Sequence, residues 1–266
     1  MVEPVTILSV NQLTIERDKA ILDKIDWHVK RGENWVILGP NGSGKTTLLK
    51  SLVGYFPPTS GDIEVLGKTF GRHNWNHLRL QIGLVSSSIQ QRIEDHEPAV
   101  DVVVSGKYAQ VNYWGRIFKK DRLRALEHMK MMGCDYLDGK NWLTFSQGEK
   151  QRLLIARALM TRLEILILDE PCAGLDPVAR EHFLESIDAL AAERPELPII
   201  LVTHHVEEIT PSFSHALIMK QGKVVSQGVI SKSLTSAHLS TAFSAPLRLR
   251  KSAGRFQLST NSKSNT

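Results

Sequence analysis

The residues best suited to chemistry in this chain form one glycine-rich loop that ends in a lysine and two threonines. Glycines allow successive backbone N–H groups to point at phosphate oxygens. Lys45 can reach the β- and γ-phosphates, and the Thr46 hydroxyl can bind Mg²⁺. The loop fits the pattern G-x-x-x-x-G-K-[ST] at every required position and predicts a nucleoside triphosphate site. Its residues are Gly39, Pro40, Asn41, Gly42, Ser43, Gly44, Lys45, Thr46 and Thr47.

The segments on both sides of this loop support the same interpretation. The apolar run 35–38 precedes it and is typical of a buried strand, and we expect a helix over residues 46–53. The N-terminus of a helix offers free N–H groups and a partial positive charge to an anion. A glycine-rich turn with an incidental lysine is the alternative. The order strand, loop and helix favours phosphate binding.

A second candidate site follows the apolar run 165–168, where Asp169 and Glu170 are adjacent. Ligands of open α/β sheets bind at the carboxyl ends of the strands. Successive strand residues point in opposite directions, so we expect the two acids to have different roles. We predict that Asp169 joins Thr46 as a Mg²⁺ ligand and that Glu170 polarises the attacking water. Two acids that simply face solvent at a strand end are the alternative.

The elements that must position these residues alternate between strands and helices. The runs 165–168 and 199–202 are continuously apolar, which is typical of central strands in a parallel sheet covered on both faces. Period-two patterns predict further strands, spacing of three to four residues predicts a helix, and a glycine at a turn predicts a hairpin. These segments are strands 6–15, 25–29 and 61–67, helix 121–132 and hairpin 217–227.

The composition is that of a globular protein. Hydrophobic residues make up 42% of the 266 residues and charged residues 23%. Cys134 and Cys172 are too few for a disulfide framework or a zinc site, so a reducing compartment fits best. Residues 1–10 lack a basic leader, so we expect no signal peptide. No apolar run approaches the ~20 residues that cross a bilayer, so another chain would supply any membrane span.

The net charge of +5 has a local origin. Five basic residues and no acidic residue follow Pro246, and in the rest of the chain basic residues equal the 28 acidic ones in number. The segment is rich in Ser, Asn and Thr and can bury little apolar surface, so we expect a basic, disordered tail over residues 246–266. Contact with anionic lipid or nucleic acid is one interpretation of this tail. A solubilising terminus is the one that we favour.

Three further segments make a resemblance specific. Residues 145–152, with Ser146, Gln147 and Gly148, resemble the signature motif of ATP-binding-cassette (ABC) ATPases. Residues 173–176 are similar to the D-loop of that family, and His204 at a strand end is similar to its switch histidine. Each motif is weak alone. Together with the phosphate loop and the acidic strand they stand in the family's order, and similar flanking strands extend the match to about residues 6–228.

The resemblance implies an α/β fold of the P-loop NTPase class. This fold has a RecA-like parallel sheet core, an antiparallel β subdomain near residues 6–71 and a helical insertion near residues 87–142, all within a cassette domain over residues 1–240. It implies hydrolysis of ATP with Mg²⁺, with Lys45, Glu170 and His204 as catalytic residues. Two copies would pair head to tail, so that Ser146 and the Gly148 amide hold the γ-phosphate on the opposite protomer.

This sequence also departs from the family pattern. Ser87 stands where a glutamine usually contacts Mg²⁺ and water, and Gln90 or Gln91 could replace it only if the loop is rearranged. No aromatic residue stands near Glu16 or Arg17 to stack on adenine, so base recognition would rest on apolar contact with residue 15 or 21. The segment from residue 33 and the serine loop, residues 86–88, look similar to small ABC ATPases described as photorepair-like or molybdate-linked.

Two functions remain open. In the first, the chain is the energising subunit of a membrane transporter with separate permease subunits, located on the cytoplasmic face of the inner or plasma membrane. In the second, it is a soluble nucleotide switch on repair or translation machinery. The presence of a single cassette favours transport, and the serine at the usual glutamine position, Ser87, favours the switch. We favour transport and expect the permease to dock on the helical region near Trp114.

Overall fold

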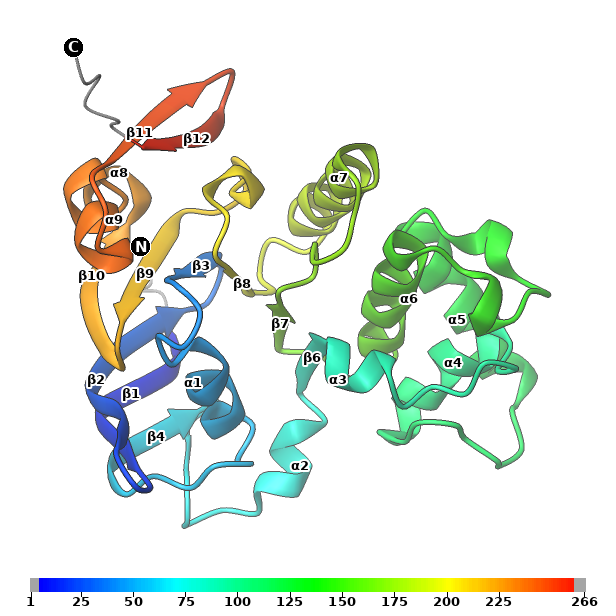
Figure 1. The fold of residues 1–266 in the computed structure, drawn as a ribbon. Coiled ribbons are helices and arrows are strands. Elements are labelled where there is room, and N and C mark those ends of the chain that lie inside the picture. Colours follow the sequence, from blue (N-terminus) through cyan, green and yellow to red (C-terminus); the bar gives the residue numbers. More distant parts are fainter. Residues whose placement is uncertain (1–4, 261–266) are drawn as a thin grey trace. The chain divides into compact units, whose positions relative to one another are not determined.

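The computed structural model describes residues 5–260, which form two compact units. Of these residues, the first unit comprises 5–78 and 198–260, and the second comprises 79–197 (Figure 1). The sequence predicted one cassette domain with a helical insertion. The second unit contains the segment predicted as the insertion and also the signature and the acidic strand.

The first unit contains an antiparallel sheet made almost entirely from the N-terminal quarter of the chain. In β1 and β2, apolar residues on one face are buried and polar residues on the other are exposed, which is the period-two pattern of a half-buried strand. The charged residues 17–19 form the turn between them. In spatial order the strands are β2 (Ala20–Lys30), β1 (Thr6–Glu16), β4 (Ser60–Val65) and β5 (Lys68–Thr69).

The other sheet of this unit carries the phosphate loop. β3 (Trp35–Leu38) and β8 (Ile199–Thr203) are buried at every position, as expected for strands with both faces covered. β3 pairs in parallel with two neighbours, and β9 and β10 form the predicted hairpin. In spatial order the strands are β10 (Lys223–Val229), β9 (His215–Lys220), β3 (Trp35–Leu38) and β8 (Ile199–Thr203).

The helices of the first unit are short. α1 follows the phosphate loop, α8 and α9 follow the β9–β10 hairpin, and α2 lies at the boundary between the two units. Their bounds are α1 (Lys45–Leu52), α2 (Trp75–Arg79), α8 (Ile230–Ser233), α9 (Ser236–Phe243) and the 3₁₀ turn η4 (Val206–Glu208).

The C-terminal segment is a β-hairpin, where the sequence predicted a disordered tail over residues 246–266. β11 (Leu247–Ser252) pairs with β12 (Arg255–Thr260), and Phe256 is buried against the rest of the unit. The prediction was wrong for these strands because one phenylalanine and alternating leucines suffice to anchor a hairpin on an existing surface. Residues 261–266 lie outside the described part of the chain.

The second unit combines a two-stranded parallel pair with a group of helices. α6 packs against three of the longer helices and against β6. The residues buried on α6 are almost all apolar, from Leu153 to Leu159. The elements are β6 (Ile82–Ser86), α3 (Ser87–Gln90), α4 (Ala99–Ser105), η1 (Gly106–Tyr108), α5 (Lys119–Met131), η2 (Asp135–Leu137), η3 (Trp142–Thr144), α6 (Gln147–Leu159), β7 (Ile165–Asp169) and α7 (Pro177–Glu193).

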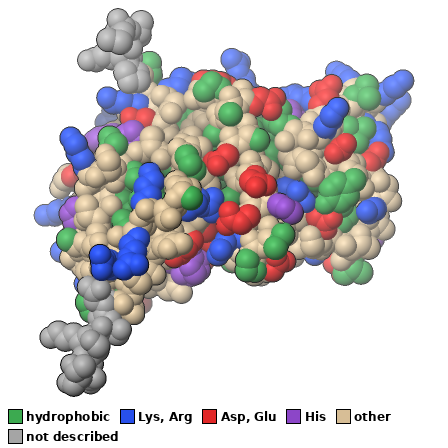
Figure 2. All heavy atoms as spheres, turned by 90° about the horizontal axis from the view of Figure 1, so that it is seen from above, with side chains coloured by type: hydrophobic (Ala, Val, Ile, Leu, Met, Phe, Trp, Pro, Cys, Tyr) green, Lys and Arg blue, Asp and Glu red, His purple; other side chains and the backbone are tan. Residues whose placement is uncertain are grey.

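The surface carries both signs of charge. On the face shown in Figure 2, Lys and Arg side chains lie among Asp and Glu side chains, with small groups of hydrophobic atoms between them. Within residues 5–260, none of the helices is long and apolar enough to cross a membrane.

Cys134 and Cys172 are both buried thiols, and burial raises the pKa of Cys134 to about 12.

Candidate nucleotide site

The phosphate-binding loop lies between β3 and α1 in the first unit. β3 pairs in parallel on both sides, so the loop begins at a fixed edge of the sheet. A Cβ atom on Gly39 would overlap the carbonyl oxygen of Met219 in β9. One on Gly44, whose φ is 101°, would lie 2.7 Å from Cδ2 of Leu22. Packing therefore requires glycine at both positions, and the positive φ of Gly44 requires it there for a second reason.

The open side of the loop suits an anion. Gly42 has a φ of 78°, and a Cβ atom there would meet nothing within 4 Å. Among the residues that the structure describes, no side chain caps the N-terminus of α1, and no acidic residue stands in its first turn. The helix N–H groups thus remain available to a ligand, and the helix dipole favours negative charge. The exposed residue Thr46 lies in the same turn.

The side chain of Lys45 folds back over the loop. Its Nζ donates to the carbonyl oxygen of Gly39 at 2.8 Å and to that of Pro40 at 3.2 Å. A buried charge is costly unless it is hydrogen-bonded, so these carbonyls hold the ammonium group inside the loop. The glycine-rich loop, the available N–H groups at the start of α1 and the Lys45 ammonium group together fit a triphosphate. Of the other predicted loop residues, Ser43 is buried, Thr47 is half-buried and Asn41 is exposed.

His204 lies at the same edge of this sheet. It follows the last residue of β8, Thr203, which is the register partner of Leu38 at the end of β3. The Thr203 hydroxyl accepts a hydrogen bond from the backbone N–H of His205 at 3.0 Å. The two histidine rings are 4.1 Å apart. The structure thus places the predicted His204 beside the start of the loop, and it adds a contacting second imidazole that the sequence analysis did not assign.

The two acids lie at the end of β7 in the second unit. β7 pairs in parallel with β6, and Asp169 is the register partner of Ser86. Both acids are half-buried. Glu170 has a φ of 49°, a left-handed conformation that costs a residue with a side chain about 1–2 kcal/mol. The chain therefore turns away from the strand direction between the two acids, which supports different roles for them.

Ser146, which lies in the segment that resembles the signature motif, is the N-cap of α6. Its hydroxyl accepts from the backbone N–H of Glu149, and its own N–H donates to Glu149 Oε2 at 2.7 Å, which completes a capping box. The Tyr136 hydroxyl donates to the other carboxylate oxygen at 2.8 Å. Burial opposes ionisation of Glu149, but the hydrogen bonds from Ser146 and Tyr136 outweigh it and keep the pKa of Glu149 below its ordinary value. The start of the helix is therefore held rigidly.

The segment after the acids lies beside this helix. Asp176 caps α7, because its side chain accepts from the N–H groups of Val178 and Ala179, both at 2.9 Å. A Cβ atom on Gly148 would lie 3.7 Å from Ala179 and 3.8 Å from Leu175. Asp176, predicted as part of a D-loop, thus has a structural role that the sequence pattern did not show.

Comparison with known proteins gives the family. The model of the family described as ABC transporter matches residues 22–173. The chain belongs to the ABC transporter ATP-binding family. It is 43% identical over 245 residues to YlmA of Bacillus subtilis (strain 168), an uncharacterized ABC transporter ATP-binding protein, covering 91% of this chain and 93% of YlmA. It is 32% identical to a phosphonates import ATP-binding protein, PhnC 2, of Nostoc sp. (strain PCC 7120), covering 79% of this chain and 86% of PhnC 2.

A solved structure agrees with this assignment. The chain resembles cbiO1 from Clostridium perfringens, described as part of the ABC transporter complex cbiONQ, with a TM-score of 0.74 and 30% identity. The match covers 84% of this chain and 88% of cbiO1. The predicted α/β P-loop fold and ABC family are thereby confirmed. As an ABC ATPase, the chain binds and hydrolyses ATP.

One of the two isoleucines that the sequence offered for contact with the base is not accessible in this ABC ATPase. Ile15 is buried in the core with 3% of its surface exposed, so it is not available to stack on a base. Ile21 is half-buried. The guanidinium of Arg17 instead lies over the ring of Phe56, 4.6 Å from its centre. Sequence reasoning missed this pair because the two residues are far apart in the chain.

The serine loop of this ABC ATPase begins α3. Ser87, which stands at the usual glutamine position, is exposed as the first residue of that helix. The hydroxyls of Ser86 and Ser88 are 2.8 Å apart. In the part of the chain that the structure describes, no group of three or more His, Cys, Asp or Glu side chains is arranged to hold a metal.

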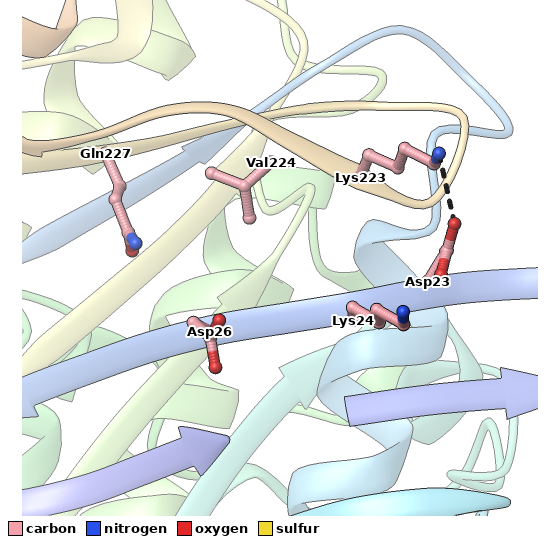
Figure 3. Close-up of a pocket in the computed structure, with 6 residues that line it drawn as sticks. All are labelled: Asp23, Lys24, Asp26, Lys223, Val224 and Gln227. Atoms are coloured by element: carbon pink, nitrogen blue, oxygen red, sulfur yellow. Dashed lines mark ion pairs between the residues drawn. The ribbon is translucent and has the colours of Figure 1, made fainter. Parts of the chain in front are cut away.

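A separate surface pocket in the first unit does not resemble a nucleotide site. It is lined by β2 and β10, and Lys223 forms an ion pair with Asp23 at 3.1 Å (Figure 3). Asp26 accepts hydrogen bonds from the backbone and side-chain amides of Gln12. All the residues that line it lie in β2 and β10, so neither a glycine-rich loop nor a helix N-terminus contributes to the pocket.

Proposed function

We propose that this ABC ATPase energises a membrane transporter whose permease is a separate chain. The observation that carries ATP use is the start of α1, where an open glycine loop, free helix amides and the Lys45 ammonium group converge. Transport is supported by the names of related proteins that cover most of this chain. One is a phosphonates import protein and another is part of an ABC transporter complex.

We assign the hydrolytic roles to residues at the start of α1 and to residues at the ends of the buried strands β7 and β8. Lys45 binds the β- and γ-phosphates, Glu170 polarises the attacking water, and His204 contacts the γ-phosphate. Thr46 and Asp169 offer the oxygen ligands that Mg²⁺ prefers. When bound, Mg²⁺ neutralises charge on the phosphates, which is the main requirement of phosphoryl transfer to water. Glu170 then needs only to orient a water and accept its proton.

We further propose that the chain works as a homodimer. Ser146 and the Gly148 amide at the start of α6 would receive the γ-phosphate of ATP bound to the second copy. The capping box supports this role because it fixes the serine in place before ATP arrives. Two copies that share each ATP in this way would close when ATP is bound and open after hydrolysis.

The proposed docking site for the permease lies between η1 and α5. Trp114 is 79% exposed there, and Phe118 is 47% exposed. The rings of Tyr108 and Tyr113 stack nearly parallel with centres 4.0 Å apart, so they pack on each other. Large exposed aromatic side chains commonly anchor protein interfaces. This segment is therefore the surface of the second unit that we assign to the partner.

The test is capture of a membrane partner with the full chain. The chain would be co-expressed with any multi-span protein encoded next to it, and membranes would be collected and washed with salt. We expect co-sedimentation that Trp114→Ala releases while basal ATPase activity is unchanged. The matched control is Tyr55→Ala, which removes an aromatic side chain that is 58% exposed on the first unit and should leave capture intact.

Two outcomes would count against transport. Failure of every multi-span candidate to bind the wild-type chain would favour the soluble switch on repair or translation machinery. Binding that survives Trp114→Ala but is lost on deletion of residues 247–266 and falls steeply with salt would assign the contact to the basic C-terminal segment. RNA or DNA recovered with that segment would then identify nucleic acid as its partner.

A further inference from the structure

Two glutamine side chains in the second unit form a closed pair. Gln90, the last residue of α3, donates from Nε2 to Oε1 of Gln147 at 2.8 Å. Gln147, the first residue of α6, donates from Nε2 back to Oε1 of Gln90 at 3.0 Å. The two residues are 57 positions apart, and both are half-buried. The pair therefore ties the end of one helix to the start of another.

A third glutamine extends this contact into the interior. Gln151 lies one turn further along α6, is 2% exposed, and donates from Nε2 to Oε1 of Gln90 at 3.4 Å. Both amide atoms of Gln90 are thus used within the protein. In this arrangement Gln90 is not disposed as a ligand for Mg²⁺ or water, which was one role left open by the sequence.

The pair connects two parts of the catalytic machinery within this unit. α3 begins directly after Ser86, the register partner of Asp169 at the end of the acidic strand. α6 begins directly after Ser146, whose hydroxyl and backbone are held by the capping box. The capping box holds Ser146 against its own helix, but it does not hold the start of that helix against the rest of the unit. The contact with Gln90 supplies this second constraint.

We propose that Gln90 is a positioning residue that acts through Gln147 to hold Ser146 and Gly148 where they receive the phosphate of ATP on a second copy of the chain. The inference rests on the proposed homodimer function of those two residues. An amide pair suits this role because its donors and acceptors match in both directions. Replacing either partner leaves a half-buried donor and acceptor without their match.

The experiment measures ATP-induced dimerisation and ATP binding separately. Gln90→Met and Gln147→Met keep the side-chain length and remove the hydrogen bonds, and they would be combined in a double variant. All are made in the Glu170→Gln background, in which ATP is consumed slowly. Dimerisation is followed by light scattering against ATP concentration, and binding to the monomer is followed by calorimetry at low protein concentration.

We expect each single variant to need roughly tenfold more ATP for dimerisation, because the start of α6 is no longer held where the second copy needs it. ATP binding to the monomer should stay close to that of the background protein, and the melting temperature should fall by only a few degrees, because the pair is half-buried. The double variant should need no more ATP for dimerisation than the single variant with the larger effect, since the two residues act as one pair. The matched control is Gln91→Met, an exposed neighbour whose substitution should change nothing.

Other results would overturn the inference. If the effects of the single variants add in full, the residues act independently. If melting temperature falls while dimerisation is normal, the pair is only structural. If monomer ATP binding or its Mg²⁺ dependence falls as much as dimerisation, Gln90 contacts the nucleotide site directly. Failure of the wild-type chain to dimerise with ATP at all would instead refute the proposed function.

Discussion

The backbone N–H of Gly222 donates to the carbonyl oxygen of Ser43 at 2.9 Å, so the turn of the β9–β10 hairpin holds the phosphate loop. The carbonyl oxygen of Gly222 accepts from the N–H of Asp23 at 2.9 Å. One residue therefore connects the loop to β2. The ion pair between Lys223 and Asp23 closes the same junction (Figure 3).

We predict that Gly222→Ala weakens ATP binding. Gly222 has a φ of 75°, and a Cβ atom there would overlap the carbonyl oxygen of Ile21. Relief of that overlap must shift the turn and its hydrogen bond to Ser43. We expect the Kd for ATP to rise roughly tenfold or more, equivalent to about 1.4 kcal/mol. Calorimetric titration with ATP measures it.

The control for this variant is Gly67→Ala. Gly67 has a nearly equal φ of 71°, but a Cβ atom there would meet nothing within 4 Å. Both variants carry the cost of a positive φ, about 1–2 kcal/mol of stability. Only Gly222→Ala should change ATP affinity. Equal affinities for the two variants would show that the turn does not hold the loop.

Glu170→Gln should separate ATP binding from hydrolysis. The amide keeps the size of the side chain and can adopt the same left-handed backbone, but it cannot accept a proton from water. We expect turnover to fall roughly 10²–10⁴-fold with the Kd for ATP unchanged. Steady-state phosphate release and equilibrium binding measure the two quantities. Near-normal turnover would move the base elsewhere, and His204→Ala would be tested next.

The free energy of unfolding should fall in mild acid because of His128. Burial, together with the positive charges of Arg124 and Arg194, lowers the pKa of His128 from 6.5 to about 4. Between these values the unfolded chain binds a proton that the folded chain does not, so stability falls as pH is lowered from 6.5 to 4. Below 4 both states are protonated and this contribution no longer changes. Urea unfolding across this range measures it.

The variant His128→Leu removes the titrating group. Neither ring nitrogen of His128 has a hydrogen-bond partner among the described residues, so replacing it with leucine removes no hydrogen bond. We expect similar stability to wild type at pH 7.5 and higher stability at pH 4.5. His182→Leu, on α7 of the same unit, is the control. A parallel pH dependence of wild type and His128→Leu would show that other groups dominate the acid loss.

The parts of the fold that sequence predicted best are those fixed by local chemistry. The run 35–38 is apolar throughout and precedes a loop that only glycine can form, so strand, loop and helix follow from neighbouring residues. The start of α6 also rests on neighbouring residues, since Glu149 stands three residues after Ser146 and completes the capping box. Lys45 could be assigned because it closes the glycine-rich loop, and His204 could be assigned because it follows a buried strand.

Sequence predicted least where contacts join distant residues. The hydrogen bonds between Gln90 and Gln147 depend on how α3 and α6 pack, which no local pattern records. The contact of Arg17 with Phe56 has the same origin. The C-terminal hairpin was predicted as disordered because its own composition is polar and basic. Its stability comes from the surface on which Phe256 is buried.

The last prediction concerns this hairpin and the segment that follows His204. Arg255 donates to the backbone carbonyl of Glu207 in η4 at 2.8 Å, and the Glu207 carboxylate accepts from the N–H of Leu258 at 3.3 Å. We expect deletion of residues 247–266 to speed amide hydrogen exchange at residues 204–210 and to lower kcat a few-fold, while the Kd for ATP stays the same. Arg248→Ala, which changes an exposed residue of β11, should leave both properties unchanged. Unchanged exchange at residues 204–210 after the deletion would show that η4 holds its conformation without the hairpin, and the link between the C-terminal segment and His204 would then be abandoned.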